Sequence, residues 1–371
     1  MSTRGTLTSG TSSEGRVSGY VFKIVRESTG RTQQQLAADL RVSTAAIQGW
    51  ESGRRPLMAM PAGQFLALRS RLCYLGATPA LMRTLTQALE ADHILGHALA
   101  TPHRAADPDG HPLGSWVLSR PLTVLTAWPI GAKAPEILRQ SSSAASRRGP
   151  VPAGPVLSAD ERRHVVEHLQ HVAERARSSD PDGLLLKRQA YYLAGYDPSP
   201  GIRQWLETMR RADQARLRPP AGWSPAWPLV RSTASALTRA GDPEPMRRFL
   251  HDQLTGETAE TANLNYWAFW TGELDEQQTS DEFIGSTSPL SWHGGQLVRH
   301  LAGRLHGNIG FTELNIRSLH TLIRVRPALA RPVAGDLQAT ITRLLDEDQV
   351  SAPARRELET LRYGIAIAHQ T

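Results

Sequence analysis

Apolar residues recur at intervals of three and four along most of the chain, which is the spacing of helices that bury one face. Val21, Ile24 and Val25 show this spacing first, and Gly30 is expected to end their helix. Ser158 and Glu161 form a capping box that begins another helix. Further helices are expected at about residues 61–76, 78–99, 183–195, 199–217, 229–240, 244–254, 257–271, 288–306, 311–325, 333–346 and 352–368.

The pattern therefore predicts an all-α fold, in which the many helices after residue 158 form a multi-helix bundle or an irregular solenoid-like region. No repeat of fixed length supports a named repeat architecture. Residues 103–135 are harder to assign, because Pro, Gly and Asp interrupt the runs SWVLS and LTVLTAWPI. Each run fits a short strand or a buried helical turn, and periodicity does not decide between them.

The stretch RTQQQLAADLRVSTAAIQGWESGRR, residues 31–55, predicts two short helices joined by one tight turn. Thr32 is placed to cap a helix over residues 33–40, and Ser43 to cap a second helix from Thr44 to about Ser52. Leu36 and Ile47 face inward, and the interval between them leaves room for a single turn. Two helices joined in this way can present the second helix to the DNA major groove.

Positive charge is concentrated in this part of the chain. The formal net charge is +7, and residues 1–70 hold nine Lys and Arg residues against four acids. An excess confined to the segment with the two-helix pattern indicates a polyanionic partner for that segment. Lysine is rare beside arginine, which is typical of a high-GC bacterial genome, and none of the three lysines lies in a phosphate-binding P-loop.

Residues 17–57 resemble the Cro/CI-type helix-turn-helix, the xenobiotic-response-element (XRE) class of bacterial transcriptional regulators. The resemblance rests on TQQQLA at 32–37, VSTAAIQGWE at 42–51 and the following SGRRP. It implies that Gln33 holds a DNA phosphate and that Arg26 pairs with Glu51. The chain departs from the family at Arg41, where glycine is common, so we expect a left-handed residue or a locally different turn.

The positions expected to contact DNA divide into two groups. Gln33 and Gln34 begin the first of the two helices, where side chains and backbone N–H groups can meet a phosphate. Base contacts are expected from the next helix, and Arg54 and Arg55 are expected to bind the DNA backbone. The expected base-reading positions are Thr44, Ala45, Gln48 and Gly49. Arg4 and Arg16 would extend this surface if residues 1–16 formed an arm.

Two other patterns offer candidate sites. HVVEH at 164–168 has the spacing of a zinc-binding helix, but no third ligand is evident, so we interpret it as a solvated helix face without a metal. NLNYWAFWTGELDE at 263–276 and GWSPAWPLV at 222–230 gather aromatic residues that fit either a core or an effector pocket. No catalytic constellation or cofactor motif stands out, so neither an enzyme nor a cofactor is expected.

These observations predict a bacterial transcriptional regulator that binds double-stranded DNA as a homodimer. A protein-interaction scaffold is the alternative. With Cys73 as its single cysteine and no apolar run of the ~20 residues that span a bilayer, the chain is expected in the cytoplasm, away from membranes.

The expected segments are a mobile tail (1–15), a helix-turn-helix DNA-binding domain (16–76), a helical or irregular connecting region (77–139), a flexible linker (140–157) and an all-helical domain for dimerisation or for binding a small-molecule or protein effector (158–371).

Overall fold

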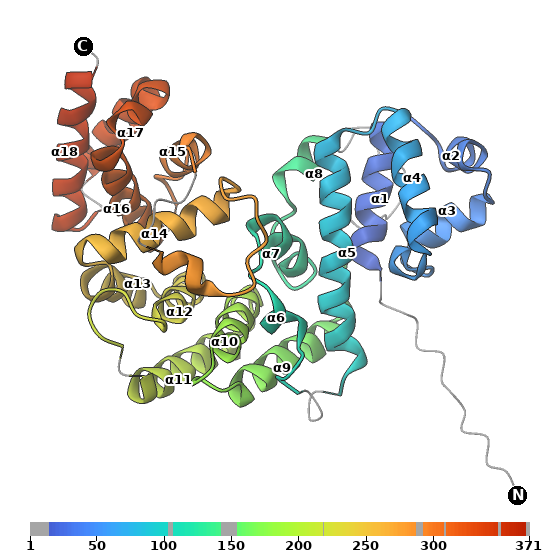
Figure 1. The fold of residues 1–371 in the computed structure, drawn as a ribbon, viewed down its shortest axis with the longest axis horizontal. Coiled ribbons are helices and arrows are strands. Elements are labelled where there is room, and N and C mark those ends of the chain that lie inside the picture. The colour runs from blue at the N-terminus through green and yellow to red at the C-terminus, as the bar shows by residue number, and fades with distance from the viewer. Residues whose placement is uncertain are drawn as a thin grey trace, which may run out of the picture. The chain divides into compact units, whose positions relative to one another are not determined.

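The computed structural model describes residues 15–102, 107–141, 154–217, 219–286, 292–307, 309–347 and 350–368. Every regular element in these ranges is helical, which confirms the all-α prediction (Figure 1). The chain divides into two compact units. Unit 1 holds residues 1–106 and 121–171, and unit 2 holds residues 107–120 and 172–371. No helix in the described ranges is long and apolar enough to span a membrane.

Unit 1 is built around α1 (Arg16–Ser28), which packs along α5 (Pro79–Ala100) and against α3 (Thr44–Glu51). Val21, Phe22 and Val25 of α1 are fully buried in this core. The remaining elements are α2 (Gln33–Leu40), the 3-10 turn η1 (Leu57–Ala59), α4 (Ala62–Tyr74), α8 (Glu136–Ser141) and most of α7 (Arg120–Ala127) and α9 (Ala159–Arg175). The helices expected near 61–76 and 78–99 are thus present as α4 and α5.

The start of α1 is fixed by a carboxylate from α5. Asp92 accepts hydrogen bonds from the backbone N–H groups of Val17 at 2.9 Å and Ser18 at 2.8 Å. These groups would otherwise lack partners, because the first turn of a helix has no carbonyls before it. Burial raises the pKa of Asp92 to about 6, and its hydrogen bonds to Val17 and Ser18 oppose that rise. The aligned N–H groups offset part of the cost of burying the carboxylate.

The compact units divide the chain differently from the expected segments. Helix α5 lies in unit 1 through its contact with α1, although residues 77–139 were expected to form a connecting region. Arg16, which would have extended the DNA-binding surface if residues 1–16 formed an arm, instead begins α1 and binds Glu161 at 2.9 Å, which joins α9 to the same unit. Of the two runs that periodicity left open, LTVLTAWPI lies mainly in the helix α7, whereas SWVLS forms no regular element after Ser115, where α6 (Pro112–Ser115) ends. The expected tail and linker fall mainly on residues 1–14 and 142–153, which lie outside the described ranges.

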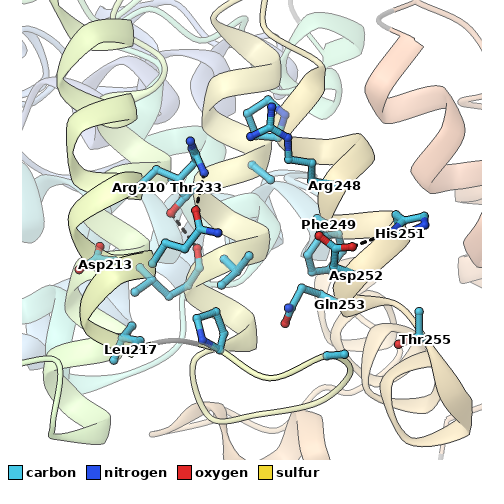
Figure 2. A pocket seen from close by; sticks show the side chains of 17 residues that line it. Arg210, Asp213, Leu217, Thr233, Arg248, Phe249, His251, Asp252, Gln253 and Thr255 are labelled. Atoms are coloured by element: carbon cyan, nitrogen blue, oxygen red, sulfur yellow. Dashed lines mark hydrogen bonds and ion pairs between the residues drawn. The ribbon is translucent and has the colours of Figure 1, made fainter.

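Unit 2 packs its helices around α12 (Trp227–Arg239), most of whose residues are buried. Its other elements are α6, α10 (Pro181–Ala194), α11 (Pro200–Leu217), α13 (Glu244–Arg248), the π-helical turn η3 (Phe249–Gln253), α14 (Gly256–Thr271), η4 (Asp281–Gly285), α15 (Gly295–Ala302), α16 (Ile309–Val325), η5 (Pro327–Val333), α17 (Ala334–Glu347) and α18 (Ala352–Ala368). A cavity lies among α11, α12 and the π-helical turn (Figure 2).

The aromatic residues of segments 222–230 and 263–276 belong mainly to the core of unit 2. Trp227 is fully buried, and Tyr266 and Trp267 are nearly so. The buried guanidinium of Arg231 lies 3.9 Å from the centre of the Tyr266 ring and 4.9 Å from that of Trp267. The aromatic faces stabilise this cation away from water. The packing therefore favours the interpretation of these segments as core rather than as an effector pocket.

We predict that Asp92→Ala destabilises unit 1 by roughly 2–4 kcal/mol, because it leaves two buried N–H groups without acceptors. Asp92→Asn keeps one acceptor oxygen, so it should destabilise unit 1 by about half as much. Hydrogen exchange of the α1 amides measures the loss within unit 1 alone. The control is Asp160→Ala, whose carboxylate is 87% exposed and should change stability by less than about 0.5 kcal/mol. Equal protection of α1 in wild type and Asp92→Ala would contradict this role.

Candidate nucleic-acid interface

The first helix of the helix-turn-helix, α2, begins and ends as its sequence indicates. Thr32 accepts a hydrogen bond from the Gln35 backbone N–H at 3.2 Å, and the Gln35 side chain accepts from the Thr32 backbone N–H at 2.9 Å. At the other end, Arg41 adopts φ 55° and ψ 42°, the only left-handed non-glycine residue in the described ranges. The turn thus keeps the glycine-like geometry with arginine, at a cost of about 1–2 kcal/mol.

The second helix, α3, is capped by Ser43, which accepts from the Ala46 backbone N–H at 3.2 Å. Its inner face is fixed against α1. Ile47 is fully buried, and the ring of Trp50 meets that of Phe22 edge to face at 5.9 Å. Gly19 allows this close approach, because a β-carbon there would overlap the carbonyl oxygen of Trp50. Packing against α1 therefore fixes which side of α3 faces outward.

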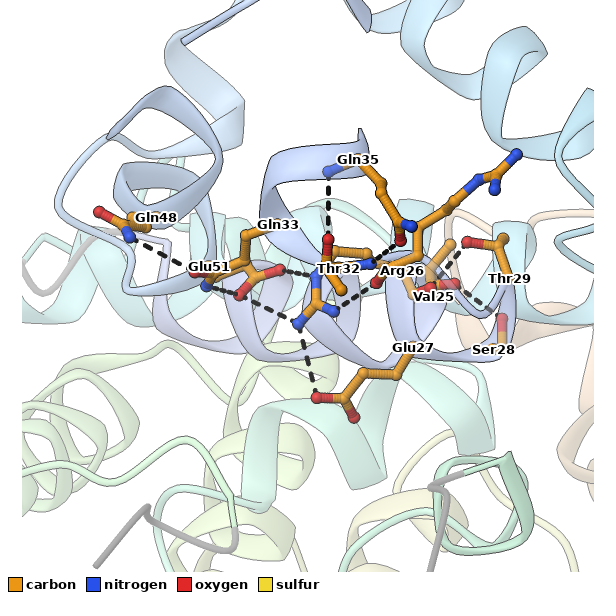
Figure 3. A network of polar contacts seen from close by, with 11 residues as sticks. Val25, Arg26, Glu27, Ser28, Thr29, Thr32, Gln33, Gln35, Gln48 and Glu51 are labelled. Atoms are coloured by element: carbon orange, nitrogen blue, oxygen red, sulfur yellow. Dashed lines mark hydrogen bonds and ion pairs between the residues drawn. The ribbon is translucent and has the colours of Figure 1, made fainter. Parts of the chain in front are cut away.

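A chain of polar contacts joins the three helices, as Figure 3 shows. Arg26 of α1 donates from Nε to Glu51 of α3 at 2.5 Å, which confirms the expected pair. The other oxygen of Glu51 accepts from Nε2 of Gln33 on α2 at 2.7 Å. Gln48 then donates to Oε1 of Gln33 at 3.4 Å. Since the side chains of Arg26 and Glu51 are only 10% and 6% exposed, this ion pair is shielded from water and salt.

The network changes what Gln33 can offer to DNA. Its side chain was expected to hold a phosphate, but its amide is bonded to Glu51 and Gln48. The capping box uses the N–H groups of Thr32 and Gln35, so those of Gln33 and Gln34 remain at the exposed start of α2. These backbone groups, together with the exposed Gln34 side chain, are the phosphate donors that this end of α2 provides.

The outward side of α3, which we call the reading face, consists of Thr44, Ala45 and Gln48. Ala45 and Gln48 are exposed, and Thr44 is half-buried. Gly49 was expected here, but it is buried beneath the side chain of Arg55. A β-carbon at Gly49 would lie 2.8 Å from Cδ of Arg55, so glycine leaves room for the arginine stem. Gly49 therefore serves packing, and no base contact is assigned to it.

Exposed arginines flank the reading face. Arg54 donates from Nε to Ser52 at 3.1 Å, and Arg55 extends from its contact with Gly49. Arg41, expected only to form the turn, is a third exposed arginine. Within the ranges that the structure describes, no carboxylate lies within ion-pair distance of these three arginines. Their charge is available to a polyanion.

The HVVEH motif does not lie on a solvated face, contrary to expectation. His164 places Nε2 at 3.1 Å from the carbonyl oxygen of Ala98 and 3.2 Å from that of Thr101. His168 is fully buried, and its ring meets that of His97 edge to face at 5.8 Å. Burial and the neighbouring histidines lower the pKa of His168 to about 4. Both histidines of the motif therefore attach α9 to α5 within unit 1.

Comparison with known families agrees with this geometry. Residues 22–59 match the family model described as helix-turn-helix. The match begins at Phe22 within α1, ends with η1 and includes α2, α3 and the turn between them. Comparison with curated proteins and with solved structures returned no match. The segment is thus an XRE-type helix-turn-helix, the class of module that binds DNA, joined to a large all-helical region.

We predict that Glu51→Ala destabilises unit 1 by about 3 kcal/mol, because it removes the buried carboxylate that pairs with the guanidinium of Arg26. Hydrogen exchange of the amides of α1 to α3 should report the loss. Glu27→Ala is the matched control, since Glu27 lies 3.5 Å from the same guanidinium but is more exposed. It should cost less than about 1 kcal/mol. Similar losses in the two variants would mean that Glu51 has no special role.

Proposed function

We propose that the protein is a sequence-specific transcriptional regulator that binds operator DNA by inserting α3 into the major groove. The observation that carries the proposal is the fixed outward face of α3, positioned by Arg26, Glu51 and Gln33 beside exposed, unpaired arginines. A rigid recognition helix next to cations is what major-groove recognition requires. Unit 2 supplies effector or partner recognition in this proposal.

Phosphate and base contacts come from different residues. Arg41, Arg54 and Arg55 provide charge, which attracts any duplex and loses strength as salt rises. Gln48 provides selectivity, because its amide can form two hydrogen bonds with the edge of adenine. Its present contact with Gln33 is long, at 3.4 Å, so exchanging it for a base costs little. Ala45 and the Thr44 methyl group fit a thymine methyl.

The small size of the reading face motivates a dimer. One helix that reads bases through Thr44, Ala45 and Gln48 buries too little surface for operator affinity, whereas two copies on half-sites one turn apart double the contacts. Helix α4 offers an apolar surface for pairing, because Leu66 is 51% exposed and Tyr74 is 80% exposed. We propose that α4 of one copy packs against α4 of another.

We predict different effects for substitutions of the two kinds of residue. Gln48→Ala should weaken binding by about 1–3 kcal/mol on preferred DNA only, and leave the salt dependence unchanged. Arg54→Ala should weaken binding to every duplex and reduce the logarithmic salt slope by about 1. Arg343→Ala is the control, because this half-exposed arginine lies on α17 of unit 2. Fluorescence anisotropy over a salt series measures both quantities.

The same titration tests the competing function. A DNA affinity that does not change with salt concentration, or that neither substitution weakens, would contradict a DNA interface on α3. That result would instead favour a scaffold whose helix-turn-helix docks a protein.

We predict that Leu66→Glu converts a wild-type dimer into a monomer, because it buries a charge at the proposed α4 contact. Sedimentation velocity measures the assembly state. Val325→Glu is the control, since Val325 is also an exposed apolar residue, at 61%, but lies in unit 2. A wild-type protein that remains a monomer both free and on DNA would exclude the dimer.

A further inference from the structure

Unit 2 contains a cavity of about 660 Å³ that the DNA-binding function does not use. It lies between α11 and the segment formed by α13 and the π-helical turn, with α12 along its base (Figure 2). Pockets for small organic molecules commonly occupy a few hundred to about 1,000 Å³. The cavity is therefore large enough for such a molecule.

Most of the cavity wall is apolar. Helix α12 contributes Leu229, Val230 and Ala234 from one face, and the π-helical turn contributes Phe249. Helix α11 turns the face that carries Arg210, Asp213, Gln214 and Leu217 toward the same space. This spacing of three, four and seven residues places all four on one side of a helix. An apolar occupant would gain free energy by leaving water for this site.

Charged residues at the cavity already have partners within unit 2. Asp213 accepts hydrogen bonds from Lys187 at 2.6 Å and from the Tyr191 hydroxyl at 2.8 Å. Arg210 forms two bonds of 2.8 Å with Glu207. Two further wall residues also have polar partners, since Arg248 donates to Glu244 and the His251 ring contacts Asp252. Charges neutralised in this way do not select an ionic ligand.

Gln253 is the exception among the polar lining residues. It is 7% exposed, and its buried side-chain oxygen Oε1 accepts no hydrogen bond from the other described residues. A buried amide oxygen without a donor is costly, and a ligand that donates a hydrogen bond to it would relieve that cost. Its backbone is held in place, because the Gln253 carbonyl accepts from Trp227 Nε1 at 3.0 Å.

The wall that carries Gln253 is a π-helical turn, a rare conformation that is frequent at functional sites. Trp227 packs edge to face on Phe249 at 5.1 Å and supports this turn from the protein interior. The cavity is therefore formed before any ligand binds, which reduces the entropy lost on binding.

We propose that this cavity binds a neutral, largely apolar small molecule whose hydroxyl or amide group forms hydrogen bonds with Gln253. The apolar walls bind the body of the ligand, and the amide orients it. Since the site lies wholly within unit 2, its occupation can be measured without DNA, and its failure would leave the DNA-binding proposal untouched.

The first test uses Nile red, a neutral apolar dye that fluoresces in apolar surroundings. The full-length protein should bind one equivalent saturably. Leu217→Asp should weaken binding about tenfold or more, because it places a carboxylate at the half-buried edge of the apolar wall. Val325→Asp, at an exposed position outside the cavity, should bind like wild type. Absence of saturable binding, or equal affinity in Leu217→Asp and wild type, would overturn the proposal.

The second test isolates Gln253 and holds even if Leu217→Asp fails to fold. Competition against Nile red compares 2-naphthol with 2-methylnaphthalene, in which a methyl group replaces the hydroxyl. Gln253→Leu removes the amide from a side chain of similar size. It should shift the ratio of the two affinities about three- to tenfold against 2-naphthol, the effect of losing a neutral hydrogen bond. An unchanged ratio would show that Gln253 does not contact the ligand and would overturn the proposed selectivity.

Discussion

The helix-turn-helix of unit 1 depends on one buried ion pair, between Arg26 of α1 and Glu51 at the end of α3. It fixes the angle between these helices, and the second oxygen of Glu51 also holds Gln33 of α2. All three helices of the motif therefore meet at one carboxylate. Because a buried charge without its partner is costly, the pair allows few alternative arrangements, and the outward face of α3 stays defined before DNA is met.

A second carboxylate, Asp92, attaches this motif to the long helix α5. Its bonds to the first N–H groups of α1 make α5 part of the unit. Unit 2 uses the same device, since Glu273 accepts bonds from the N–H groups of Gly294 at 2.9 Å and Leu297 at 3.2 Å, at the start of α15. Distant acidic side chains thus complete helix ends in both units. In each case the anion lies where the helix dipole favours it.

The features that could be predicted from the sequence are those that depend on residues close together in the chain. Helical periodicity located most helices, and the caps by Thr32, Ser43 and Ser158 are present because each joins residues three apart. The Arg26–Glu51 pair followed from a family resemblance. Contacts between distant segments gave no such signal. Nothing near Asp92 in the sequence indicates that it caps α1, and nothing near His168 indicates burial against His97. Gly49 appeared exposed by position alone, because its cover comes from Arg55.

We propose that α3 reads a defined DNA sequence in two copies of the protein. The most direct test is to sequence the genomic fragments that the full-length protein retains at ~150 mM salt, where nonspecific charge attraction is weakened. We expect enrichment of an inverted repeat whose half-sites lie about one helical turn apart, and loss of that enrichment in Gln48→Ala. Retention of fragments without any shared sequence would contradict it.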